Sequence, residues 1–294
     1  MRDLSGYVGR RFREAALEPP PLPGGGSTLR RWSVLADLAG EDLSLARLCE
    51  GHFDALAILD ELGGPRPEPG SLWGVWAAKP GALELSGDRV SGVKPYCSGA
   101  AACTDVLVTV GPDLYAAKPG APVPGTWPAT GMAASDSRDV RFDAVPVRYV
   151  GPYVDRPGFH HGGAGVAAVW YGGARAIARR MVGTDDPHAL AHLGAADIAL
   201  RSARNALEEA AAQIDDDPLD HKGEAAARAL RVRALVADAA ADVMDRTGRA
   251  LGAGPLSHDE EHGRRVADLT VYLRQHHAER DLAALGALTD GRAW

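Results

Sequence analysis

Gly131-Met-Ala-Ala-Ser-Asp-Ser-Arg-Asp-Val-Arg-Phe-Asp-Ala-Val-Pro-Val147 is the stretch of sequence that decides the fold. Its first half is polar and predicts a turn. Over residues 140–143 apolar and polar side chains alternate, which is the pattern of a half-buried β-strand. Pro146 has no amide hydrogen to donate to a sheet, so we expect the strand to stop there.

The sequence around this strand has the pattern of a small β-domain, which we place at residues 71–155. Gly and Pro interrupt it repeatedly, and the apolar runs between them are too short for helices. These runs are Trp73–Ala77, Leu83–Leu85, Asp105–Val110 and Val140–Phe142.

Residues 1–70 are predicted to form a short N-terminal helical region. The stretch to about Leu17 is polar and weakly patterned, and the proline- and glycine-rich residues 19–26 form a linker. Ser27 is a candidate N-cap for a helix to about Ala39. Asp42 can cap a second helix, which Gly63 and Gly64 end.

Residues 156–294 are alanine-rich and predict an antiparallel four-helix bundle. The first helix follows Pro157. Asp186 and Pro187 supply the N-cap and first residue of the second. The third spans about residues 223–251 and ends at Gly252. The fourth runs from Ser257 or His258 to Leu285.

Composition narrows the class of protein. The chain has 294 residues, of which 46% are hydrophobic, so it can bury a sizeable core. Its formal net charge is −7 and its basic residues are dispersed, which disfavours nucleic acid and anionic membranes as partners. No apolar segment has the length of a signal peptide core or a membrane span. We therefore expect a cytoplasmic protein.

The cysteines favour the same compartment. Cys49, Cys97 and Cys103 are odd in number and lack metal-ligand spacing, which is typical of a reducing environment. We expect them to be small buried hydrophobes. His160 and His161 have no cysteine or carboxylate at ligand spacing, so they are expected to cap or pack, and no metal is predicted.

The Gly131–Val147 stretch resembles the "G-M-(R)-A-S/T-D-S-x-x-V-x-F-D-x-V-x-V" segment of the acyl-CoA dehydrogenase family, a family of FAD-dependent flavoproteins. Further resemblances occur in the family's order, at residues 41–53, 96–108 and 162–168. The resemblance implies N-terminal helices, a β-domain and a helical bundle, in that order. The N-terminal helical region is shorter than the family's usual one, which leaves the substrate class open.

The resemblance also implies a set of flavin-binding positions in the β-domain. Tyr96 takes the place of the aromatic residue that covers the flavin, and Ser98 that of a hydroxyl at its polar edge. Residues 76–80 take the place of the family's "x-x-T-E-P" strand end, which makes Trp76 and Ala78 cofactor candidates. Ala78 and Lys79 replace the Thr and Glu there. Alternatively, Tyr96 and Ser98 are ordinary strand residues.

Two positions in the bundle correspond to the family's sites for the rest of FAD. His192-Leu-Gly stands in place of "Q-F-G", without the upstream Arg, and makes His192 a cofactor candidate. Residues 249–254 stand in place of "Q-x-x-G-G-x-G" without the Gln. A helix cap and turn explain these glycines better than a phosphate site.

The catalytic base is sought in the last helix. The resemblance places Gln275-His-His-Ala over the family's "Y-E-G-T", so His276 stands where a Glu takes the α-proton. A histidine there resembles the family's flavin monooxygenase branch, and imidazole can act as a base near neutral pH. Glu279, three residues on, is expected to orient His276 or act as a displaced base. A solvated helix face with ion pairs is the alternative.

Three hypotheses follow. The first is an FAD-dependent oxidoreductase that acts on an acyl thioester or a similar carbonyl-activated small molecule. The second, in the same family, is a flavin monooxygenase. The third is a flavin-free structural or partner subunit, which the missing Gln, Arg, Thr and Glu favour. Because the family's flavin site spans subunits, the resemblance implies a homodimer or homotetramer.

Overall fold

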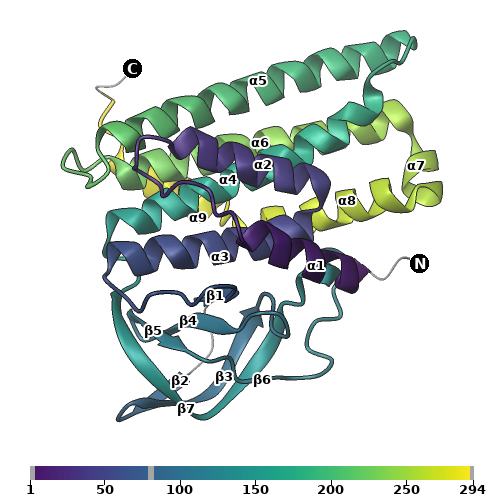
Figure 1. Ribbon diagram of the computed structural model, residues 1–294. Helices are drawn as coiled ribbons and strands as arrows, with labels where there is room; N and C mark the ends of the chain where they lie inside the picture. Colours follow the sequence, from purple (N-terminus) through teal and green to yellow (C-terminus); the bar gives the residue numbers. More distant parts are fainter. Residues whose placement is uncertain (1–3, 79–82, 292–294) are drawn as a thin grey trace. The chain divides into compact units, whose positions relative to one another are not determined.

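The computed structural model describes residues 4–78 and 83–291, drawn in Figure 1. Its contacts divide the chain into two compact units. Unit 1 comprises Met1–Pro20 and Ser44–Phe159, and unit 2 comprises Pro21–Leu43 and His160–Trp294. The N-terminal helices are therefore divided between the units. Each unit is described by itself below.

A mixed sheet dominates unit 1. Among the described residues, its strands are β1 (Trp73–Trp76), β2 (Leu83–Ser86), β3 (Arg89–Cys97), β4 (Asp105–Val110), β5 (Asp113–Ala117), β6 (Ala121–Pro122) and β7 (Arg138–Pro152). The order is β1-β4-β5-β7-β3-β2, with β6 paired to β7. The β1–β4 pair is parallel and the others are antiparallel. All four runs predicted as strands overlap these elements, with Ala77 just after β1.

The prediction that Pro146 stops its strand is wrong. Figure 1 shows β7 as one long, curved strand. It pairs with β3 as far as Pro146 and with β5 from Val147 onward. Ala144, just before the change, has a φ of 46°. The missing amide hydrogen of Pro146 thus falls where the strand changes partners.

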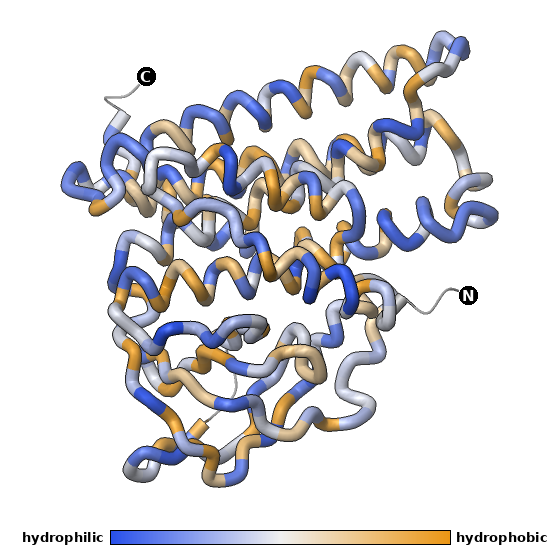
Figure 2. The backbone as a smooth tube through the Cα atoms, viewed as in Figure 1, coloured by the Kyte–Doolittle hydropathy of each residue, from blue (hydrophilic) through white to orange (hydrophobic). Residues whose placement is uncertain are grey.

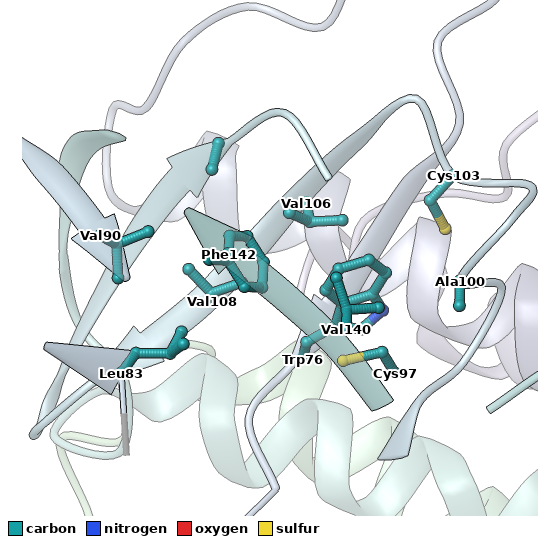
Figure 3. Close-up of a cluster of buried hydrophobic side chains, with 11 residues drawn as sticks. Trp76, Leu83, Val90, Cys97, Ala100, Cys103, Val106, Val108, Val140 and Phe142 are labelled. Atoms are coloured by element: carbon teal, nitrogen blue, oxygen red, sulfur yellow. The ribbon is translucent and has the colours of Figure 1, made fainter. Parts of the chain in front are cut away.

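The core of the sheet is built around two aromatic side chains, Trp76 and Phe142. Their ring centroids lie 6.2 Å apart at 72°, an edge-on arrangement. Figure 3 shows them among the valines of β4 and β7, with Cys97 and Cys103 beside them. All three cysteines are buried and free, as predicted. Burial raises the pKa of both thiols in this cluster, that of Cys103 to about 12, so they stay protonated and unreactive.

Two helices accompany this sheet: α1 (Leu4–Ala16) and α3 (Leu43–Glu61). The first was not predicted, because among its residues whose burial is described (6–16) only Val8 and Phe12 are buried, and its sequence is weakly patterned. It is stabilised by tertiary contacts. Phe12 packs edge-on against His52 of α3, and the Nδ1 atom of His52 accepts the Trp73 amide of β1 at 3.1 Å.

Unit 2 consists of helices. They are α2 (Thr28–Glu41), α4 (Pro157–Ala178, which begins in unit 1), α5 (Pro187–Asp216), α6 (Ala225–Leu251), α7 (Ala253–His258), α8 (Glu260–Tyr272) and α9 (Glu279–Leu288). Helices α5 and α6 lie side by side (Figure 1). Figure 2 shows polar and apolar residues recurring along both, the pattern of helices with one buried face.

The helix ends in unit 2 follow the predictions in two places and depart from them in two. The Asp186 carboxylate accepts the Ala189 amide at 2.7 Å and caps α5, and Gly252, with a φ of 66°, ends α6, both as predicted. The expected single last helix is instead broken into α7, α8 and α9. Ser27 stands at the N-cap of α2, but its side chain makes no cap hydrogen bond.

Asp215 of α5 caps α2 in place of Ser27. Its carboxylate accepts the Thr28 hydroxyl at 2.6 Å, the Thr28 amide at 3.0 Å and the Gly26 amide at 3.1 Å. The proline-rich linker therefore ends on a specific anchor. His161 packs within the same unit, where its Nε2 donates to the Pro218 carbonyl at 2.9 Å, as expected for a packing residue.

Among the described residues, no helix combines the length and apolar character needed to cross a membrane.

Candidate functional site

The polar first half of the Gly131–Val147 stretch is hydrogen-bonded to another turn, at residues 98–101. The Gly99 amide donates to the Ser135 carbonyl at 2.8 Å and the Ala100 amide to the Asp136 carbonyl at 3.1 Å. Asp136 is itself held by a two-pronged ion pair from Arg138, at 2.6 and 2.9 Å. This stretch therefore positions Ser98 at the end of β3.

The hydroxyl of Ser98 lies at the centre of a polar network. It accepts from the Nε atom of Arg47 at 3.2 Å and lies 2.9 Å from the Ser137 hydroxyl. Ser137 continues to Ser135 at 2.8 Å, and Arg47 is paired with Glu50. Ser135 and Ser137 are both buried. Arg47 and Ser137 were not predicted as site residues, because they come from distant parts of the chain.

A small cavity of about 10 Å³ lies beside this network. Arg47, Ser98 and Cys103 are among the residues that line it, together with Gly74 of β1. That volume is of the order needed for one water molecule. The network is thus nearly closed within unit 1.

The other predicted flavin positions in unit 1 differ in exposure. Tyr96 is 59% exposed and has a φ of 57°, a backbone conformation that is uncommon for a residue with a side chain. Trp76 is 1% exposed, and its indole donates to the Ser98 carbonyl at 3.0 Å, so its side chain belongs to the core. Ala78 is half-buried just after β1. Lys79 and Pro80 lie outside the described residues.

His276, the predicted base, lies in unit 2 in a break between helices. After a 3-10 turn at Leu273–Gln275 its backbone is extended, and Ala278 has a φ of 45° before α9 begins at Glu279. The side chain of His276 is 8% exposed and packs edge-on against Trp170 of α4, with ring centroids 6.2 Å apart. Sequence periodicity does not reveal this break, since no Gly or Pro marks it.

Two charged residues frame His276. Arg233 of α6 lies over the Trp170 ring at 4.8 Å and donates to the carbonyls of Gly163 (2.8 Å) and Gln275 (3.2 Å), which ties the break to α4. Asp281 of α9 is also close, with its carboxylate 3.9 Å from the His276 Nε2.

The expected role of Glu279 rested on a continuous helix, and that premise is wrong. Glu279 is exposed at the first turn of α9, and His276 is not on that helix. The carboxylate near His276 belongs to Asp281, which also accepts the His277 amide at 3.2 Å.

The electrostatic surroundings of His276 favour its neutral form. Burial lowers its pKa below the usual value, and the positive charge of Arg233 adds to this, while Asp281 and Asp238 act in the opposite direction. Neither its Nε2 nor the neighbouring Trp170 Nε1 has a hydrogen-bond partner among the described residues, although both atoms are buried. Such pairs of unsatisfied atoms are uncommon in folded proteins.

His192 lies in the second turn of α5 and is half-buried. The glycine turn after α6 acts as a helix end, as the residue pattern favoured. The predicted positions thus form two groups: Trp76, Ala78, Tyr96 and Ser98 in unit 1, and His192, His276 and Glu279 in unit 2.

Comparison with solved structures identifies the fold. TdsC, a dibenzothiophene monooxygenase from Paenibacillus sp. A11-2 solved with FMN and indole, has a TM-score of 0.75 and 17% identity, over 97% of this chain and 95% of TdsC. The HsaA monooxygenase from M. tuberculosis has a TM-score of 0.77 and 16% identity, over 98% and 94%. The chain has the acyl-CoA dehydrogenase-like fold of these neighbours.

A third neighbour, KijD3, was solved with FMN and a dTDP-sugar and has a TM-score of 0.70 and 18% identity, over 96% of this chain and 90% of KijD3. No protein-family model and no curated protein matches the chain. The likeness therefore concerns the acyl-CoA dehydrogenase-like fold, which is mixed α and β, as predicted. Fold alone does not determine function, so function depends on the site residues.

Proposed function

We propose that this protein is a flavin-dependent oxidoreductase that acts on a small molecule, and that its reaction is a monooxygenation. The observation that carries the proposal is the His276 Nε2, a buried nitrogen that has no hydrogen-bond partner among the described residues and belongs to a ring packed against Trp170. A buried polar atom of this kind is costly unless a bound group completes its hydrogen bond. A histidine at position 276, in a chain with this fold, supports a role in proton transfer.

The residues of unit 1 fit a flavin in part. Ser98 offers a hydroxyl held in place from two sides by Arg47 and Ser137, which suits a hydrogen bond to the polar edge of a flavin ring. The exposed ring of Tyr96 is free to cover an aromatic face. Trp76 contributes through its support of the Ser98 carbonyl rather than through its own ring.

A bound flavin supplies two-electron redox chemistry, and the chain supplies the rest. His276 is kept neutral by burial, so its Nε2 can accept a proton from a substrate or a hydrogen bond from a donor. Arg233 and Trp170 hold its ring in one position. In unit 2 we assign no role in proton transfer to Glu279, because it is exposed.

Two reactions compete within this proposal. Dehydrogenation of an acyl thioester needs a base, and the family resemblance implies a Glu at the position where this chain has His276. That difference favours monooxygenation, and the monooxygenases among the fold neighbours support it. FMN is present in the TdsC and KijD3 structures, whereas the family resemblance implies FAD. We expect a cytoplasmic homodimer or homotetramer, which light scattering tests.

The deciding experiment is flavin binding to the whole purified chain. Absorbance and fluorescence titrations with FMN and with FAD, oxidised and reduced, are expected to show binding of at least one form. Ser98→Ala should weaken it, whereas Ser86→Ala, at an exposed position on β2, should not. If no form binds, the enzyme proposal is overturned and the flavin-free subunit is favoured.

If flavin binds, the reaction type follows from a second experiment. With reduced flavin and oxygen, candidate aromatic and amine substrates are tested for oxygen insertion, with His276→Ala as the matched variant. We expect the variant to bind flavin but to lose product. Anaerobic reduction of the flavin by acyl thioesters would instead favour dehydrogenation.

A further inference from the structure

The polar network at the end of β3 is a row of hydrogen bonds between two fixed ends. It begins at the Nε atom of Arg47, which lies 3.2 Å from the hydroxyl of Ser98. It continues through the hydroxyls of Ser137 and Ser135, over distances of 2.9 and 2.8 Å. It ends at the carbonyl oxygen of Met132, 2.7 Å from the Ser135 hydroxyl. Each hydroxyl has one hydrogen to donate, so the two ends limit where every hydrogen can lie.

The Met132 end fixes the direction of the row. A carbonyl can only accept, so the hydrogen of Ser135 points to Met132. Ser135 must then accept from Ser137, since its own hydrogen is already used. The hydrogen of Ser137 is used in turn, so Ser98 donates to Ser137. In the reverse direction the Ser135 hydroxyl and the Met132 carbonyl would be two acceptors 2.7 Å apart with no hydrogen between them.

The Arg47 end agrees with this direction. A guanidinium stays protonated and can only donate, so its Nε–H occupies one lone pair of the Ser98 oxygen. Arg47 is itself paired with Glu50. The Ser98 hydroxyl thus accepts once and donates once within the protein. Its oxygen keeps a second lone pair, for which the described residues supply no donor.

Ser98 is the serine of this row that a ligand can reach. Ser135 and Ser137 are 1% and 6% exposed, whereas Ser98 is half-buried. We propose that Ser98 contacts its ligand only as a hydrogen-bond acceptor, and that Ser135 and Ser137 are positioning residues that set this direction. The inference rests on the proposed function for the identity of the ligand, which is a flavin.

This direction selects between the two redox states of a flavin. An acceptor at Ser98 requires an N–H group on the ligand. More N–H groups are present on a reduced flavin ring than on an oxidised one, so Ser98 favours the reduced ring.

The direction itself is tested without flavin, by neutron diffraction from crystals of the whole protein exchanged into D2O. We expect the deuterium of Ser98 to lie between its own oxygen and that of Ser137. A deuterium on the outward side of Ser98, with Ser137 donating to Ser98, would overturn the proposal. This result does not depend on flavin binding, so a failure of this inference and a failure of the proposed function are distinguishable.

Ser135→Ala is the variant that should reverse the row. Without the Ser135 oxygen, the buried hydroxyl of Ser137 is satisfied by donating to Ser98, and the hydrogen of Ser98 then turns outward. The Met132 carbonyl keeps two donors, the amide of residue 135 at 3.0 Å and the Trp127 indole at 3.1 Å. We therefore expect the variant to fold.

The second measurement is the ratio of the dissociation constants of oxidised and reduced FMN for the whole protein, under anaerobic conditions. Ser135→Ala should lower this ratio about fivefold or more, because Ser98 then donates where it previously accepted. Ser44→Ala is the matched control, since Ser44 is equally buried in unit 1 and its hydroxyl has no partner among the described residues. An unchanged ratio in Ser135→Ala, or the same change in Ser44→Ala, would overturn the proposal. If neither form of FMN binds, the proposed function fails and the neutron measurement decides this inference.

Discussion

Gly172 of α4 lies directly against Ala36 of α2, so closely that a Cβ atom at position 172 would stand 2.1 Å from the Ala36 carbonyl oxygen. Real Cβ atoms do not approach a backbone atom to that distance. The two helices therefore pack with backbone against backbone at this point.

Gly172→Ala is expected to destabilise the protein. The added methyl group forces the helices apart, which typically costs about 1–3 kcal/mol, more than the gain of about 1 kcal/mol in helix propensity. Urea denaturation measures the change. Gly163→Ala on the same helix is the control, because the structure places no described atom within 4 Å of a Cβ there; it should be neutral or stabilising. A stable Gly172→Ala variant would contradict the close contact.

Acid is expected to destabilise the protein through His52. Burial lowers the pKa of His52 from 6.5 to about 4, while a hydrogen bond to the Ala16 carbonyl opposes the shift. Between about pH 4 and pH 6.5, His52 is therefore protonated in the unfolded chain but neutral in the folded one. The stability due to this group is full above pH 6.5 and falls by about 3 kcal/mol as the pH drops to 4.

The measurement is the free energy of unfolding at pH 7 and at pH 4, for the natural chain and for His52→Asn. The Asn oxygen can replace the Nδ1 atom that accepts the Trp73 amide. Between pH 7 and pH 4 the variant should lose about 3 kcal/mol less stability than the natural chain. An identical pH dependence of the two chains would rule out His52 as the cause.

Asp281 and Arg233 are expected to shift the pKa of His276 in opposite directions. Asp281→Asn removes a negative charge that raises this pKa, so it should fall further. Arg233→Gln removes a positive charge that lowers it, so it should rise. Histidine titrations by NMR measure both. Shifts of the same sign in the two variants would show that the break has rearranged.

Asp215→Ala is expected to destabilise the N-terminus of α2. Loss of an N-cap carboxylate costs about 1–2 kcal/mol. The neighbouring Asp216→Ala is the control, because Asp216 pairs with Lys222 and its side chain is 70% exposed. Its change should be close to zero. Urea denaturation compares the two, and equal effects would argue against the cap.

The sequence predicted the elements whose signals are local. A short apolar run at residues 105–110 and alternation at residues 140–143 marked two strands. Asp186 and Gly252 marked helix ends. Each of these signals depends on neighbours along the chain. Helix α1 was not predicted, because its stability comes from contacts with residues around position 52. Pro146 was misjudged because whether a strand continues depends on which neighbour it pairs with.

In the candidate site, too, local sequence signals were predictable and contacts between distant residues were not. By itself the sequence determined the fold class, through the resemblance of Gly131–Val147, and pointed to Ser98 and His276. Only the tertiary structure decided what surrounds them: Arg47 lies 51 residues from Ser98 and Ser137 lies 39 residues from it, and Arg233 reaches the break at His276 from another helix. The reason is physical, because hydrogen bonds and burial between distant segments exist only after the chain has folded and leave no periodic pattern in the sequence.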